Sequence, residues 1–126
     1  MPSEEEILST IALTFVPGIG ARTARRILQQ MGSAAHFFDV CRKYRIPGVK
    51  PEDLNSTAIK AYFTQAEEEL TFALTNEVTP RLITSSDYPN RLKTCEDAPA
   101  VLYSRGNMEL NAQRMIAVVG TRQATP

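Results

Sequence analysis

Hydrophobic residues in the first half of the chain recur at the spacing of amphipathic helices. The first predicted helix begins near Glu4, and its apolar side chains share one face: Ile7, Leu8, Ile11 and Phe15. Ser3 and Glu6 form an S-x-x-E capping box at its start, in which each side chain satisfies a backbone N–H of the other residue. This helix is expected to end at the Pro-Gly-Ile-Gly sequence of residues 17–20.

Two shorter helices are predicted next. One runs from Ala21 to Met31 and ends at Gly32, and the other follows Ser33, a good N-cap residue. The second of these carries Phe37 and Phe38, which we assign mainly to the core because of their helical spacing, although such rings can also stack on nucleic-acid bases. His36 has no nucleophile beside it and is interpreted as a partly buried structural residue. Residues 41–55 hold two prolines and are predicted to be mostly loop.

The clearest pattern predicts a long helix over residues 56–77. Its apolar residues form one stripe: Ile59, Tyr62, Phe63, Ala66, Leu70, Ala73 and Leu74. The acidic run of residues 67–69 lies mainly away from that stripe and is interpreted as a solvated face.

After residue 79 the period becomes that of strands. Short apolar runs predict strands at 81–84, 100–103 and 115–119, so the fold class is α+β, with a helical domain over residues 1–79 and a sheet-forming part over 80–126. The last run is continuous and leads into a glycine turn, which is typical of the opening of a parallel α/β sheet. The helix that such a strand feeds is missing from the sequence. We therefore expect a fragment, or a C-terminal part that packs against partners elsewhere.

Composition changes this picture mainly through the distribution of charge. The 126 residues carry 14 basic and 14 acidic groups, so the formal net charge is zero. Residues 1–50 hold seven basic and four acidic groups. Residues 51–78 hold one basic and six acidic groups, and residues 79–126 hold six basic and four acidic groups. The neutral total excludes a uniformly basic coat, but it conceals a basic block between residues 15 and 50, where Asp39 is the only acid.

Several classes of protein are disfavoured by the residues that the chain lacks. Cys41, Cys95 and the single His36 do not have the spacing of a zinc site, so no metal or other cofactor is expected. Two cysteines without a secretory signal also disfavour a disulfide framework. The N-terminus is acidic, and no apolar run approaches the length of a membrane span. These features predict a cytoplasmic protein without membrane contact.

The segment Val16–Leu28 matches the helix–hairpin–helix pattern. Its two glycines allow a tight turn, Ile19 between them can enter the core, and the amides at the start of the second helix point outward, where the helix dipole favours a phosphate. The residues assigned to DNA contact here are Gly18, Ile19, Gly20, Arg22, Thr23, Arg25 and Arg26. Such contacts do not depend on base identity, so double-stranded DNA is a candidate ligand as well as single-stranded DNA. The alternative is a plain helical hairpin whose glycines only form the turn.

A series of motifs in the last 47 residues points to a family. In order, they are Leu82-Ile83-Thr84, Asp87-Tyr88-Pro89, Leu92, Asp97-Ala98-Pro99, Val101-Leu102-Tyr103, Gly106-Asn107 and Ile116-Ala117-Val118-Val119-Gly120-Thr121-Arg122. This series resembles the DNA-processing protein A family, DprA or Smf, except that Ala98 stands where a second proline is usual. The helical part is similar to the SAM-like or helix–hairpin–helix domain that many members carry at the N-terminus.

The resemblance implies a role in DNA processing rather than a reaction. Members of the family bind single-stranded DNA during natural transformation, protect it and help to load the RecA recombinase. Their Rossmann-like domain contacts phosphates through a Gly-Ser/Thr-Arg turn, which corresponds here to Gly120, Thr121 and Arg122. No catalytic residue and no cofactor are implied. RecA contacts and the surface of a homodimer belong to the part of the family pattern that lies beyond residue 126.

Two other functions remain open. In the first, the helical domain binds proteins and never touches DNA. In the second, the parent protein is a nucleotide-processing enzyme of related fold, in which Gly120-Thr121-Arg122 cradles a nucleotide phosphate. The second is disfavoured because no G-x-G-x-x-G follows the strand at 115–119 and no acid–base pair is evident.

Overall fold

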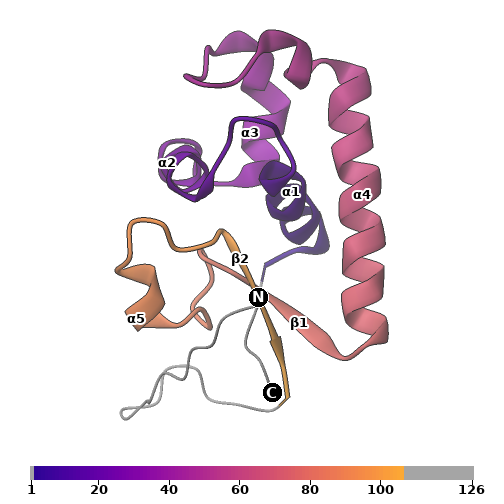
Figure 1. Ribbon diagram of the computed structural model, residues 1–126, viewed down its shortest axis with the longest axis vertical. Coiled ribbons are helices and arrows are strands. Elements are labelled where there is room, and N and C mark those ends of the chain that lie inside the picture. Colours follow the sequence, from indigo (N-terminus) through magenta and orange to yellow (C-terminus); the bar gives the residue numbers. More distant parts are fainter. Residues whose placement is uncertain (1, 107–126) are drawn as a thin grey trace, which may run out of the picture.

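The chain is known from a computed structural model, which describes residues 2–106 (Figure 1). The helices are α1 (Glu4–Thr14), α2 (Ala21–Met31), α3 (Ala34–Val40), α4 (Ser56–Thr75) and α5 (Asn90–Lys93), with 3-10 turns η1 (Cys41–Lys43) and η2 (Pro51–Leu54). The strands are β1 (Val78–Leu82) and β2 (Val101–Arg105). The predicted α+β class is therefore confirmed.

The two strands pair in an antiparallel ladder, with Val78 opposite Arg105 and Leu82 opposite Val101. β1 begins three residues before the predicted strand and contains Pro80, which was expected to lie before it. A proline is tolerated there because an edge strand leaves one side of its backbone unpaired. The predicted strand at 115–119 lies outside the described residues.

The start of α1 contains one of the two hydrogen bonds of the predicted capping box. The Ser3 side chain accepts a hydrogen bond from the Glu6 N–H at 3.1 Å, as expected. The Glu6 carboxylate does not reach back to Ser3. It accepts instead from the Ala34 N–H at 2.6 Å and so caps the first turn of α3. This bond between two helices cannot be seen in a local sequence pattern.

The predicted end of α2 and the predicted start of α3 are confirmed. Gly32 follows α2 with a φ of 85°, and Ser33 accepts a hydrogen bond from the His36 N–H at 3.1 Å. Phe37 is fully buried, and Phe38 stacks edge-on against Phe63 of α4 with ring centroids 5.0 Å apart. The interpretation of His36 as partly buried is wrong, since its side chain is exposed on the outer face of α3.

Helix α4 is the long helix that the apolar stripe predicts, although it ends at Thr75 rather than near Glu77. Ala66, Leu70 and Ala73 are buried against α1 and the first strand. Leu74 is an exception, because the last turn extends past the other helices (Figure 1) and leaves this side chain 63% exposed.

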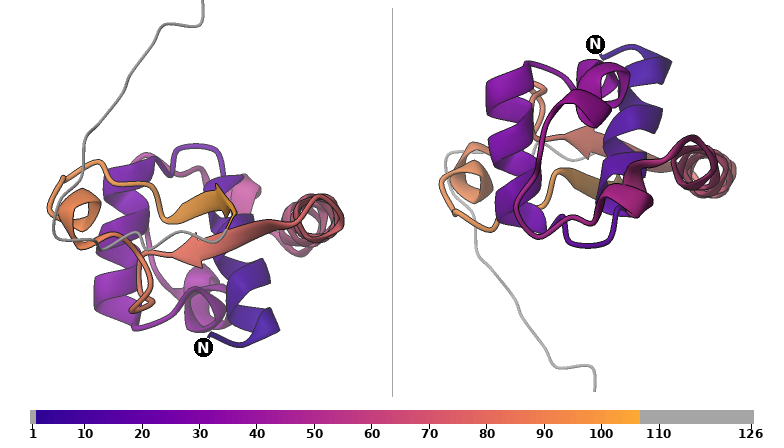
Figure 2. Two further views of the ribbon diagram at one scale, coloured as in Figure 1. Left: turned by 90° about the horizontal axis from the view of Figure 1, so that it is seen from below. Right: turned by 90° about the horizontal axis from the view of Figure 1, so that it is seen from above.

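Residues on both sides of position 79/80 share one hydrophobic core. Ile83, Tyr88, Ala98 and Ala100 pack in the same cluster as the apolar side chains of α1, α2 and α3. Figure 2 shows the strands and α5 lying against these helices in both views. The described part of the segment after residue 79 therefore packs against the helical hairpin and helps to stabilise it.

Candidate nucleic-acid interface

The turn between α1 and α2 is held by buried apolar side chains. Val16 and Ile19 are 2% and 7% exposed, and the Ile19 N–H donates to the Val16 carbonyl at 3.2 Å. Ala24, Ile27 and Leu28 of α2 are buried as well. Ile19 thus enters the core, as the sequence pattern predicts, and its side chain is not available to a ligand.

The two glycines of the turn have different roles. Gly18 has a φ of 89°, and a Cβ atom there would lie 2.1 Å from the carbonyl oxygen of Gly48. The hairpin turn is therefore in backbone contact with the loop between η1 and η2. Gly20 is the N-cap residue of α2, has an extended backbone and faces open space.

Helix α2 begins with free backbone donors. Its cap residue has no side chain, and its first internal hydrogen bond runs from the Ala24 N–H to the Gly20 carbonyl at 2.9 Å. The N–H groups of Ala21, Arg22 and Thr23 are left without an acceptor inside the helix. Together with the helix dipole, they form a local environment that favours an anion.

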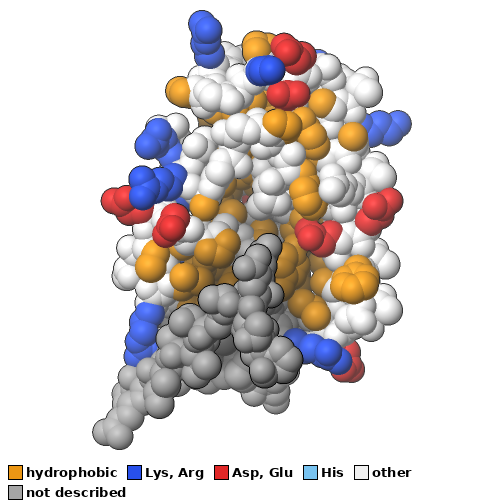
Figure 3. Space-filling view, in the orientation of Figure 1, with side chains coloured by type: hydrophobic (Ala, Val, Ile, Leu, Met, Phe, Trp, Pro, Cys, Tyr) orange, Lys and Arg blue, Asp and Glu red, His pale blue; other side chains and the backbone are white. Residues whose placement is uncertain are grey.

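The three arginines of α2 have different partners. Arg25 donates to the Cys95 carbonyl at 2.7 Å, so it ties α2 to the segment after α5. Arg22 forms an ion pair with Glu96 at 3.3 Å, in which both side chains are largely exposed. Arg26 is exposed and makes no hydrogen bond or ion pair within residues 2–106. In Figure 3, Lys and Arg side chains follow the edge of the molecule over α2, with acidic side chains beside them.

A groove of about 370 Å³ separates the start of α2 from β2. Gly20 and Ala21 line one side, and Val101 and Tyr103 line the other. The Tyr103 hydroxyl donates to the Glu69 carboxylate of α4 at 2.9 Å. Burial raises the pKa of Tyr103, and its hydrogen bond to Glu69 raises it further.

Alkaline pH is expected to destabilise the protein partly through Tyr103. Because its folded pKa lies above the ordinary value of 10.0, its contribution to stability is present below that pH and is lost as the pH rises toward the folded pKa. Between about pH 8 and pH 11, wild type should lose more free energy of unfolding than Tyr103→Phe in urea titrations. Some loss should persist in the variant because burial also raises the pKa of Tyr62 and of Tyr88. Equal losses in both proteins would contradict the expectation.

The predicted site residues thus fall into separate groups. Gly20, Arg22 and Thr23 lie at the start of α2, and the exposed Arg26 lies one turn further along the helix. Ile19 and Arg25 instead make contacts within the chain. Gly120, Thr121 and Arg122 lie outside the described residues. The partners at Cys95 and Glu96 could not be found from the sequence, since they come from a distant loop.

Comparison with known protein families finds a match in the last part of the chain. Residues 80–126 match the family model of DNA recombination-mediator protein A. This match confirms the resemblance that the motifs of this segment indicate, and it covers 47 of the 126 residues. No curated protein and no solved structure matches the chain significantly. Among the residues that the structure describes, none of the helices is both long and apolar enough to span a membrane.

Proposed function

We propose that the chain contacts the phosphate backbone of DNA through the start of α2. The observation that carries this proposal is the uncapped first turn, whose free N–H groups lie beside the exposed Arg22, with the exposed Arg26 one turn further along α2. Backbone N–H groups at a helix start and an arginine fork suit a phosphate. Glu69, across the groove, disfavours an anion on that side. A phosphate therefore approaches from the solvent side, where the Arg22–Glu96 pair is weak enough to exchange.

The family match over residues 80–126 supports a wider proposal. We infer that the α1–α2 unit is a helix–hairpin–helix of the SAM-like type, and that residues 80–126 open a Rossmann-like domain in which Gly120, Thr121 and Arg122 contact phosphates. The parent protein would be a cytoplasmic recombination mediator without enzymatic activity. It would bind and protect single-stranded DNA entering during natural transformation, help to load RecA and form homodimers.

Salt-dependent DNA binding tests the hairpin. In titrations of the 126-residue chain with labelled single-stranded and double-stranded DNA, Arg26→Ala should weaken binding. It should also reduce the slope of log affinity against log salt by about 0.7 for single strands and 0.9 for duplex. Glu96→Gln should strengthen binding, because it releases Arg22 from its ion pair.

A charge-matched control separates a contact from a general loss of positive charge. Arg105→Ala removes one exposed cation from the last residue of β2, which does not line the groove beside α2, and should leave both affinity and slope almost unchanged. Equal effects of Arg26→Ala and Arg105→Ala would contradict a hairpin contact. Absence of DNA binding at low salt would also contradict a hairpin contact.

A second candidate is a protein-interaction module. It is favoured by the use of Arg25, and in part Arg22, for contacts within the chain. Under this alternative the arginines orient the loop at Cys95 and Glu96. The Arg26→Ala and Glu96→Gln variants would then bind DNA no differently from wild type.

A further inference from the structure

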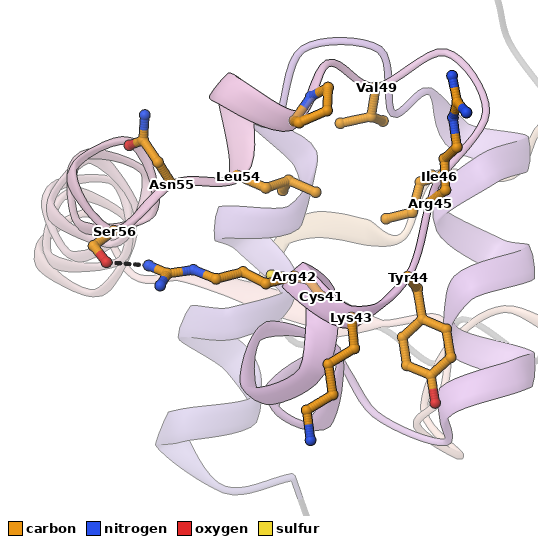
Figure 4. Close-up of a pocket in the computed structure, with 11 residues that line it drawn as sticks. Cys41, Arg42, Lys43, Tyr44, Arg45, Ile46, Val49, Leu54, Asn55 and Ser56 are labelled. Carbon is orange, nitrogen blue, oxygen red and sulfur yellow. Dashed lines mark hydrogen bonds between the residues drawn. The ribbon is translucent and has the colours of Figure 1, made fainter.

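A second basic surface lies between the end of α3 and the start of α4. It is a groove of about 710 Å³ formed by η1, η2 and the loop that joins them, shown in Figure 4. Three cations line it, Arg42, Lys43 and Arg45, and its lining contains no carboxylate. The nearest acids in the sequence are Asp39, Glu52 and Asp53, which flank the lining residues without belonging to them.

The cations of this groove are available to a ligand. Arg42, Lys43 and Arg45 are all exposed. Arg42 extends across the groove, and its guanidinium donates to the Ser56 hydroxyl at the start of α4 (Figure 4). Lys43 and Arg45 make no hydrogen bond or ion pair to the residues of the described part. Three cations without a charged partner in so small a region favour a phosphate-bearing ligand.

An aromatic ring accompanies these charges. Tyr44 is 55% exposed, and its backbone N–H is bonded to the Cys41 carbonyl at 3.4 Å. The ring projects to the same side as Lys43, as Figure 4 shows. The lining between the cations is apolar, with Leu54 buried and Val49 half-buried. An exposed ring beside cations can stack on an unpaired base.

The groove adjoins the hairpin. Its loop carries Gly48, whose carbonyl lies against Gly18 of the turn before α2. The two basic surfaces are therefore joined by a backbone contact, although they use different residues.

We propose that this groove is a second contact site for single-stranded nucleic acid. Arg42, Lys43 and Arg45 hold phosphates, and Tyr44 stacks on a base. The inference deepens the proposed function, on which it rests for the class of ligand, and assigns that ligand a separate surface. Duplex DNA is disfavoured here because its bases are already stacked within the helix.

Substitution of Tyr44 tests the stacking contact. In titrations of the 126-residue chain, Tyr44→Ala should weaken binding of labelled oligothymidylate by about 5- to 100-fold, whereas Tyr44→Phe should bind as wild type does. Neither variant should change binding of an abasic oligodeoxynucleotide of the same length. Because Tyr44 is exposed, both variants should melt at the wild-type temperature. Equal affinity of wild type and Tyr44→Ala for oligothymidylate overturns the proposal.

A double variant, Lys43→Ala/Arg45→Ala, tests the phosphate contacts. It should weaken binding of both oligonucleotides and reduce the salt slope by about 1.4. Loss of binding in Arg26→Ala with no effect of the groove variants overturns this proposal alone. Loss of binding in the groove variants with no effect of Arg26→Ala overturns the hairpin contact and supports the groove. Binding of polyglutamate, but not of oligothymidylate, through Lys43 and Arg45 would identify an acidic protein partner and overturn the nucleic-acid assignment.

Discussion

Gly18→Ala is expected to destabilise the protein more than any other glycine substitution in the described chain. The new Cβ would lie 2.1 Å from the Gly48 carbonyl oxygen, a distance that no real contact reaches, so one of two backbone segments must move. The φ of 89° adds the cost of a left-handed conformation, about 1–2 kcal/mol for a residue with a side chain. Overpacking adds about 1–3 kcal/mol. Urea denaturation followed by helical circular dichroism measures the sum.

Two other glycines provide matched controls for this substitution. Gly32→Ala has a similar φ of 85° with nothing within 4 Å of the new Cβ, and Gly48→Ala has only an ordinary contact at 3.6 Å. Both should lose about 1–2 kcal/mol, the conformational part alone. A Gly18→Ala variant no less stable than these controls would show that the turn and the loop are not in the contact described. In the folded fraction of Gly18→Ala, DNA binding through the start of α2 and DNA binding through the groove should both be weakened.

Tyr88→Ala is the second large effect, with an expected loss of about 3–5 kcal/mol in the free energy of unfolding. The ring is completely buried in the cluster that also holds Leu13 and Phe37, and the hydroxyl donates to the Pro99 carbonyl at 2.8 Å. Because that cluster includes α1, α2 and α3, the helical signal should melt at a lower urea concentration, although Tyr88 itself lies outside these helices.

Tyr88→Phe is the matched variant, because it keeps the ring and removes only the hydroxyl. It should cost about 1 kcal/mol, the value of one hydrogen bond. If Tyr88→Ala left the helical transition unchanged, residues 1–79 would be an independently stable domain. The division at 79/80 stays a prediction until that measurement is made.

The parts of the fold that depend on neighbouring residues could be predicted from the sequence. The stop at Gly32, the cap at Ser33 and the buried Ile19 each follow from a few adjacent positions. The long helix follows from a stripe sustained over several turns. The prediction is wrong for Leu74 in the last turn, which is exposed, because the period of a stripe does not show where the neighbouring helices end.

The candidate site was less accessible to sequence analysis, for a related reason. Charge alone placed Arg22, Arg25 and Arg26 in one group, but packing separates them by joining Arg25 to the Cys95 carbonyl. The sequence pattern predicts only a loop for residues 41–55. This loop nevertheless holds four consecutive residues, Arg42 to Arg45, that combine charge with an aromatic ring. Both the charge and the aromatic ring can be read from the sequence. The contact between Gly18 and Gly48, which joins the loop to the hairpin, was not visible without the fold.

The positions of the two thiols also give the chain a natural attachment point for a fluorescent or spin probe. Cys41 is 1% exposed, and burial raises the pKa of its thiol, so its reactive thiolate is scarce at neutral pH. Cys95 is exposed, and its carbonyl accepts the hydrogen bond from Arg25. A maleimide reagent would therefore label one position beside α2 without any engineered cysteine, and the unmodified sequence can report on events at the hairpin.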